Sequence, residues 1–267
     1  MTALRKRAIT VSALVPATAL LLAGCGGGPG RGSAAEPSGG GPSTGTSAKA
    51  AAGDAAVPEA TTFTTVEGAP ADDGRDATDG LVVRPAKPLP VLDRPGGHRV
   101  ATLPTEQLGG PTWVPVVESS GDWRRVLLPS RPNRASGWIS AAGLRTARSP
   151  YLVTVELGER RLTLRRSGRT VGRWRVAIGE AATPTPAGRT FVMAQLAPDG
   201  KKLVLPLGAH SDTLDTFGGG PGTVALHGWH DPAVFGRAVT HGCVRVPDDA
   251  LRKLSRVPLG TLVLIND

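Results

Sequence analysis

The chain has 267 residues, a formal net charge of +9 and 40% hydrophobic residues, enough for one large or two modest domains with a real core. This composition excludes a wholly disordered protein. Its two cysteines, Cys25 and Cys243, are too few for a disulfide scaffold or a cysteine-rich zinc module, so each thiol needs its own explanation.

The N-terminus has the pattern of an export signal. Three basic residues at 5–7 precede an apolar run over 8–23, which is short for a membrane-spanning helix. The run ends at Leu22-Ala23-Gly24-Cys25, which resembles the bacterial lipobox, where the cysteine is acylated and becomes the first mature residue. We therefore expect residues 1–24 to be a lipoprotein signal peptide and the lipid on Cys25 to hold the protein at the outer face of the cell membrane. An uncleaved anchor helix is the alternative.

A low-complexity stretch follows. Gly, Ala, Thr, Pro and Ser fill 41 of the 55 positions over 26–80, with almost no large apolar side chain. Such a segment buries too little surface to order itself, so residues 25–80 are predicted to be the lipidated N-terminus and a disordered linker.

Positive charge is concentrated after the linker. Residues 81–267 carry 25 Lys and Arg against 14 Asp and Glu, a net charge of +11. Export and the lack of aromatic residues among the basic runs argue against nucleic acid as a partner. An anionic cell-wall polymer or lipid headgroups fit better, and an ordinary solvated basic surface is the alternative.

Residues 81–148 read as an all-β domain. Short apolar runs between Gly, Pro and Asp turns predict strands at 89–92, 113–117, 123–128 and 137–139. Two segments resemble the bacterial Src-homology-3-like domain, namely Ser120-Gly121-Asp122-Trp123-Arg124-Arg125-Val126 and Ser136-Gly137-Trp138-Ile139. The resemblance implies a small β-barrel that binds cell-wall peptides or positions a neighbouring catalytic domain.

Residues 150–267 are also mainly β. Strands are predicted at 151–155, 161–164, 173–178 and 261–265. One short helix is predicted between Pro247 and Pro258, because Asp248 and Asp249 suit the positive end of a helix dipole.

The chemistry-bearing residues gather in this second part. His227 lies sixteen positions before Cys243, and a thiol attacks only as thiolate, so a reactive cysteine needs an imidazole nearby. Gly242 leaves room for a substrate carbonyl and lets backbone N–H groups face an oxyanion. Two alternatives are a buried, inert cysteine and a zinc site built from His227, His230, His241 and Cys243, although these lack compact metal-ligand spacing.

Four motifs in order resemble the L,D-transpeptidase family, whose YkuD-type domain cross-links bacterial peptidoglycan. They are Thr185-Pro186-Ala187-Gly188, His227-Gly228, the stretch from Asp231-Pro232 to Gly236-Arg237-Ala238-Val239, and Thr240-His241-Gly242-Cys243-Val244-Arg245. The resemblance implies a β-sandwich with a short helix over residues 150–267 and a cleft that exposes Cys243.

The same resemblance implies roles for individual residues. Cys243 is the expected nucleophile, His227 the imidazole that takes its proton, and Gly228 the residue that orients His227 through its carbonyl. Thr240, His241 and Gly242 are expected at the oxyanion and substrate pocket. Arg245 either supports this loop or meets a substrate carboxylate.

The implied reaction is acyl transfer from the third residue of a tetrapeptide stem, with release of D-alanine, to an amine of a neighbouring stem. It needs no metal and no organic cofactor. The alternatives are an L,D-carboxypeptidase, anchoring of a wall protein by the same thioester, metal-dependent amidase chemistry, and a non-catalytic wall-binding lipoprotein.

Overall fold

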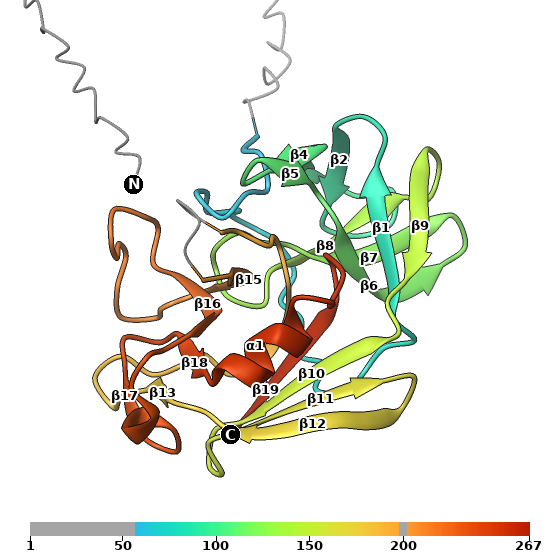
Figure 1. The fold of residues 1–267 in the computed structure, drawn as a ribbon. Helices are drawn as coiled ribbons and strands as arrows, with labels where there is room; N and C mark the ends of the chain where they lie inside the picture. Colours follow the sequence, from blue (N-terminus) through green and yellow to red (C-terminus); the bar gives the residue numbers. More distant parts are fainter. Residues whose placement is uncertain (1–56, 198–201) are drawn as a thin grey trace, which may run out of the picture. The chain divides into compact units, whose positions relative to one another are not determined.

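The computed structural model describes residues 57–197 and 202–267, which belong to one compact unit (Figure 1). The predicted signal peptide, the lipidation site at Cys25 and the linker over 26–56 lie outside the described residues. Within the described part the chain is mainly β with a single short α-helix, which confirms the predicted fold class. None of the helices found there has the length and apolar character needed to cross a membrane.

The first sheet is built from the segment after the predicted linker. It has seven strands, and four of them, β2, β6, β7 and β8, lie at positions predicted from the sequence. In sheet order the strands are β3 (Arg99–Leu103), β2 (Leu89–Leu92), β8 (Ser136–Ser140), β7 (Trp123–Leu127), β6 (Val114–Ser120), β1 (Leu81–Pro85) and β9 (Leu144–Arg148), with β4 (Glu106–Gln107) and β5 (Gly110–Pro111) forming a separate pair. The Src-homology-3-like identity of residues 81–148 stays a prediction.

The second part of the chain forms a five-stranded and a three-stranded sheet. The five-stranded sheet has the order β12 (Arg169–Arg175), β11 (Arg161–Arg166), β10 (Tyr151–Glu156), β19 (Leu262–Asn266) and β14 (Gly188–Phe191). The three-stranded sheet has the order β15 (Val204–His210), β16 (Thr223–Gly228) and β18 (Val244–Val246), and β13 (Ile178–Gly179) pairs with β17 (Ala238–Thr240).

Strand β19 lies between two hydrophobic cores. Because side chains alternate along a strand, Val263 and Ile265 enter the core of the second part, whereas Leu262 and Leu264 enter a core shared with the first sheet. Phe191 of β14 joins that shared core, which also contains Val83 and Val114. The first part of the chain therefore shares its hydrophobic core with the second part, which also has a core of its own.

Helix α1 (Asp248–Leu254) begins after Pro247, as the sequence predicts. Two acidic residues occupy its first turn and two basic residues its last, and both arrangements favour the helix dipole. Ala250, Leu251 and Leu254 face inward and pack into the core of the second part. The helix thereby covers the buried face of the sheet that carries the candidate site.

The prediction of a disordered linker as far as residue 80 is wrong for residues 57–80. This segment buries Ala60, Val66 and Asp72 and bridges to strand β3 and to Arg131. Ala60 and Val66 join the core that contains Val83 and Val114, and polar contacts with distant residues add to this burial. The carboxylate of Asp72 accepts two hydrogen bonds from the guanidinium of Arg189, one of them at 2.7 Å.

The strand predicted over 173–178 is divided. β12 ends at Arg175, and the next three residues find other backbone partners. Ala177 exchanges hydrogen bonds with Arg245 at 2.9 and 3.0 Å, and Ile178 donates to the carbonyl of Arg237. The chain thus leaves the five-stranded sheet here and supports the segment on either side of Cys243.

Candidate active site

The parallel pair β16 and β18 places the predicted site residues on one face of a sheet. Leu226 pairs with Val244 and His227 with Arg245. Val224, Leu226, Val244 and Val246 form the buried face and belong to the core. Because side chains alternate, the opposite face presents His227 and Arg245, together with Cys243, which lies immediately before β18. The sheet therefore brings the thiol, the imidazole and the guanidinium to one side.

His227 is held in one tautomer by its neighbour. Its Nδ1 lies 3.0 Å from the carbonyl oxygen of Gly228, and a carbonyl only accepts, so Nδ1 carries the proton. Nε2 is left as the proton acceptor. Burial lowers the pKa of His227, the bond to Gly228 raises it in part, and the charge of Arg245 lowers it further. The imidazole is thus neutral at neutral pH and able to take a proton.

Cys243 is a free, half-buried thiol. Burial raises its pKa above the ordinary value, while a backbone hydrogen bond with Ala225 and the positive charge of Arg245 lower it in part. The thiol is therefore protonated at neutral pH, and it depends on a base to become nucleophilic.

Hydroxyl groups fix the turn before Cys243. The hydroxyl of Thr240 donates to the carbonyl of Cys243 at 2.6 Å and accepts from the N–H of Gly242 at 3.2 Å. The buried hydroxyl of Thr185 donates to the carbonyl of Gly242 at 2.8 Å and accepts from Gly179 at 2.9 Å. The turn is consequently tied to the Thr185-Pro186-Ala187-Gly188 motif.

Gly242 provides a backbone conformation that this turn requires. Its φ is +111°, a backbone region that residues with a side chain rarely adopt. Its N–H donates to the hydroxyl of Thr240, and its place at the oxyanion pocket stays a prediction. The turn aims the following residue, Cys243, toward the face that carries His227.

Thr183 supports the same turn, and the sequence analysis did not identify it. Its buried hydroxyl donates to the carbonyl of Thr240 at 3.0 Å. The sequence signal is weak, because a threonine two residues before a Thr-Pro motif is also an ordinary turn residue.

Arg245 stacks on Trp229. Its guanidinium carbon lies 3.6 Å from the centre of the indole ring. The ring centres of Trp229 and His230 are 5.1 Å apart. Within the described part of the chain the Nε of Arg245 is buried and has no hydrogen-bond partner. Trp229 therefore sets where the positive charge beside Cys243 lies.

Replacing Trp229 with leucine is expected to raise the pKa of Cys243, because Arg245 loses the surface that holds its charge near the thiol. The effect should be a few-fold slower alkylation by iodoacetamide at neutral pH, in line with a cation–π energy of about 0.5–2 kcal/mol. Alkylation followed by intact-protein mass spectrometry across pH measures it. Trp229→Phe, which keeps an aromatic face, is the control, and equal profiles for the two variants would contradict the prediction.

His241 points away from the buried turn. It is exposed, and its ring lies 5.1 Å from that of Phe217, which comes from the loop between β15 and β16. Phe217 was not identified from the sequence, because a lone aromatic residue in a Gly-rich loop carries no distinctive signal. Among residues 57–197 and 202–267 no group of three or more His, Cys, Asp or Glu side chains is arranged to hold a metal.

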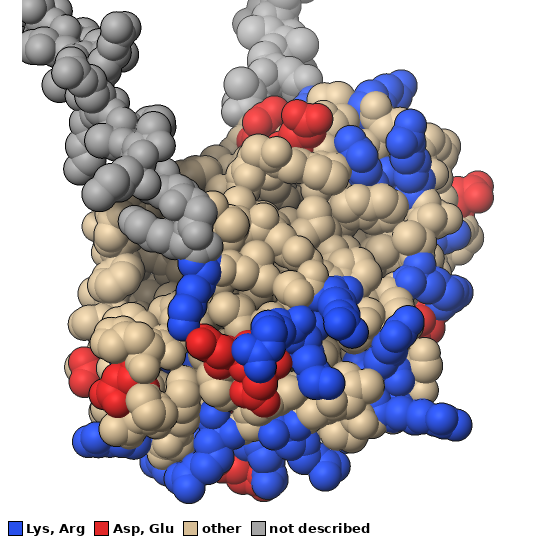
Figure 2. Space-filling view, in the orientation of Figure 1, with Lys and Arg blue, Asp and Glu red and all other residues tan. Residues whose placement is uncertain are grey.

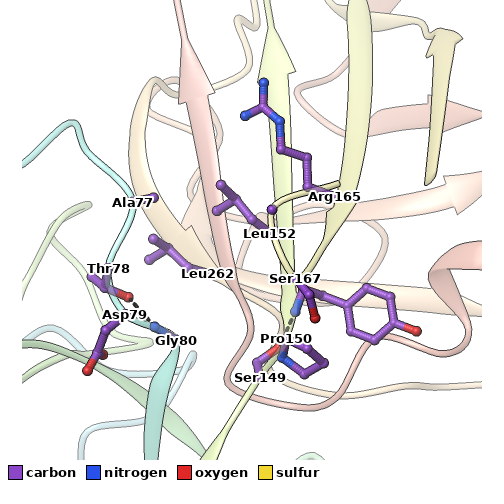
Figure 3. A pocket seen from close by; sticks show the side chains of 12 residues that line it. Ala77, Thr78, Asp79, Gly80, Ser149, Pro150, Leu152, Arg165, Ser167 and Leu262 are labelled. Atoms are coloured by element: carbon purple, nitrogen blue, oxygen red, sulfur yellow. Dashed lines mark hydrogen bonds between the residues drawn. The ribbon is translucent and has the colours of Figure 1, made fainter. Parts of the chain in front are cut away.

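One cavity adjoins the site. It has a volume of about 370 Å³ and is lined by His227, Gly228, Trp229, His230 and residues 202–204. Another cavity, of about 310 Å³, lies where the segment 77–80 meets β10 (Figure 3). None of the predicted site residues lines it. This first cavity reaches His227 from the side of Trp229 and His230.

Comparison with known proteins agrees with this geometry. The model of the L,D-transpeptidase catalytic domain, YkuD, matches residues 150–265. A Bacillus subtilis protein named "Putative L,D-transpeptidase YkuD" is 34% identical over 119 residues, which are 44% of this chain and 66% of that protein, just under two thirds of its length. A protein of the same name from Bacillus licheniformis is 34% identical over 151 residues, 53% of this chain and 86% of that one.

A solved L,D-transpeptidase from Mycobacterium smegmatis shares 14% identity and covers 58% of this chain and 82% of its own, with a TM-score of 0.39. The Bacillus licheniformis relative is 34% identical to this chain over 86% of its own length, which establishes common family membership. The chain belongs to the YkuD family of L,D-transpeptidases.

Proposed function

We propose that this protein is a peptidoglycan L,D-transpeptidase in which Cys243 is the nucleophile. The observation that carries the proposal is the face shared by β16 and β18. There a protonated thiol immediately before β18 and a neutral imidazole on β16, with Nε2 as its proton acceptor, lie on one side of the sheet. Such a pair performs nucleophilic acyl transfer when the imidazole accepts the thiol proton.

The proposed first step forms a thioester. His227 Nε2 takes the proton of Cys243, and the sulfur attacks the carbonyl carbon of the third residue of a tetrapeptide stem. The bond to the terminal D-alanine breaks, and the imidazolium returns its proton to the leaving amine. In this proposal the amide of Cys243, the attacking residue, donates to the developing oxyanion.

The second step decides the product. An amine from a neighbouring stem attacks the thioester, His227 takes its proton, and the new amide bond forms as the thiol is regenerated. The cavity beside Trp229 and His230 lies on the His227 side, from which an acceptor amine would have to approach. Water in place of the amine would give a carboxypeptidase.

The surface suits an anionic cell-wall polymer. Figure 2 shows Lys and Arg side chains gathered on the part of the face where Figure 1 places β11 and β12. Five arginines of these two strands are exposed, namely Arg161, Arg166, Arg169, Arg173 and Arg175. Long-range attraction of this kind concentrates an oppositely charged partner near the protein.

The test is incubation of residues 57–267 with tetrapeptide-stem muropeptides, followed by mass spectrometry, with Cys243→Ala as the blank. Loss of D-alanine together with a dimeric product supports the proposal. Monomeric tripeptide alone shows a carboxypeptidase, and the absence of any product that depends on Cys243 overturns the catalytic assignment in favour of a binding protein.

We also propose that a lipid on Cys25 holds the protein at the outer face of the cell membrane. The support is the Leu22-Ala23-Gly24-Cys25 sequence at the end of the apolar run. Fractionation of cells that express the full chain tests it. Cys25→Ala should move the protein out of the membrane fraction, and unchanged partition would contradict the lipid anchor.

A further inference from the structure

The loop between β15 and β16, residues 211–222, reaches the candidate active site. At its tip Phe217 and Gly220 exchange backbone hydrogen bonds of 3.0 Å, and Gly218 and Gly219 have positive φ between them. Phe217 is 52% exposed and its ring lies against His241, two residues before the nucleophile. The conformation of this loop therefore determines whether Phe217 covers His241, next to the turn that carries Cys243.

The loop has little burial of its own to hold this conformation. Most of its residues are exposed, and only its two end residues, Ser211 and Gly222, are buried. Segments with few buried contacts open at low free-energy cost unless something outside them fixes their backbone.

Arg131 supplies that support from the first part of the chain. It lies between β7 and β8, and its guanidinium donates to the carbonyls of Ser211 at 3.1 Å, Leu214 at 3.2 Å and Pro221 at 3.1 Å. These three carbonyls come from both ends of the loop. Bonds from a charged donor are about twice as strong as neutral ones, so one side chain closes the base of the loop.

Arg131 is itself held in place by the segment before the first sheet. Its N–H donates to the carbonyl of Thr64 at 3.0 Å, and its carbonyl accepts from the N–H of Val66 at 2.8 Å. Its neighbour Asn133 exchanges hydrogen bonds with the backbone of His210, at the end of β15, at 2.7 and 2.8 Å. The donor is thus pre-positioned before it meets the loop.

We infer that Arg131 is a positioning residue for the active site: by bonding both ends of the 211–222 loop, it keeps Phe217 against His241 and shapes the approach to Cys243. Arg131 lies outside residues 150–265, which the family model matches. The first part of the chain is in this sense a component of the reaction machinery. The kinetic part of this inference rests on the proposed function, whereas the structural part does not.

The test uses the full chain with Arg131→Met, and Arg134→Met as the matched control. Arg134 belongs to the same turn, but within residues 57–197 and 202–267 its guanidinium pairs only with the exposed Asp73, at 3.2 Å. Hydrogen exchange is measured by mass spectrometry, and the rate of acyl transfer on tetrapeptide stems is measured alongside it. Arg131→Met should speed exchange in 211–222 by about tenfold or more while β10 and β19 keep wild-type protection.

Acyl transfer should fall by about tenfold in the same variant, because small displacements of groups around a reacting centre are costly in rate. Phe217→Ala should show a similar loss, and the double variant should be no worse than Phe217→Ala alone, since both changes act on one contact. Arg131→Lys keeps the charge but not the fork of donors, and should restore part of the protection.

Unchanged exchange in 211–222, or losses that multiply in the double variant, would overturn the inference. If Arg131→Met fails to fold, Arg131→Lys and Asn133→Ala provide the same comparison. If the wild-type protein shows no acyl transfer at all, the proposed function fails, and the exchange data still decide whether Arg131 holds the loop.

Discussion

Replacing His227 with alanine is expected to slow attack by Cys243 at neutral pH by a factor on the order of 100 to 10,000, the usual range for loss of a general base. The reason is that the pKa values of Cys243 and His227 shift in opposite directions. Burial raises the pKa of Cys243, so the thiol is protonated, and burial lowers the pKa of His227, so the imidazole is free to accept that proton. Removing the imidazole leaves only the small thiolate fraction.

The pH dependence distinguishes this mechanism from a preformed thiolate. In the wild type the rate falls when His227 becomes protonated, so the acid limb should have its midpoint below about 6.5, the ordinary imidazole pKa. In His227→Ala the rate should instead rise about tenfold per pH unit toward the raised pKa of Cys243. The measurement is iodoacetamide alkylation from about pH 5 to 10, read by intact mass.

His230→Ala is the control for this prediction. His230 is exposed and contacts Trp229, and it lies beyond the end of β16 rather than on the strand that faces Cys243. It should retain the wild-type profile to within a few-fold. An alkylation rate in His227→Ala equal to that of the wild type would remove His227 from the mechanism.

Replacing Asp72 with asparagine is expected to lower the free energy of unfolding by about 3–5 kcal/mol, the typical loss when one partner of a buried ion pair is removed. The side chain of Asp72 is 1% exposed and that of Arg189 is 11% exposed. The change leaves the guanidinium buried without its counter-charge. Urea unfolding followed by tryptophan fluorescence measures the loss.

Asp73→Asn is a matched control for this change. Asp73 is the next residue, and it pairs with Arg134 at 3.2 Å on the surface, where its side chain is 81% exposed. Exposed pairs contribute about 0–1 kcal/mol, so this variant should be near the wild type. Arg189→Met in the Asp72→Asn background should recover part of the stability. Equal losses for Asp72→Asn and Asp73→Asn would refute the importance of the buried pair.

The elements that could be predicted from the sequence are those with a local signal. The strands over 89–92 and 151–156 are short apolar runs between turns, and α1 has a proline before it and acids in its first turn. Segment 57–80 carries no such signal. Its order comes from contacts with distant residues, such as that of Asp72 with Arg189, 117 residues away, and composition alone gives no sign of them.

The site was predictable as far as its motif extends. His227, Gly228 and Cys243 stand in a recognisable spacing, and the register of β16 and β18 places His227 on the face that Arg245 shares, next to Cys243. Arg131 and Phe217 were not predictable. Each is an ordinary residue in its own segment, and its part in the site comes from which loop folds against which.

With the proposed lipid on Cys25, the order of residues 57–80 would limit how far from the membrane the protein can work. If Cys25 carries the lipid, the covalent path to the first described residue, Val57, spans the 31 residues 26–56 rather than the 55 residues 26–80. At about 3.3–3.6 Å per residue, the longest possible path is about 100–110 Å instead of about 180–200 Å. This upper limit holds for any conformation of 26–56. Under the proposed function, a lipid on Cys25 would confine the folded part of the chain to within this distance of the membrane.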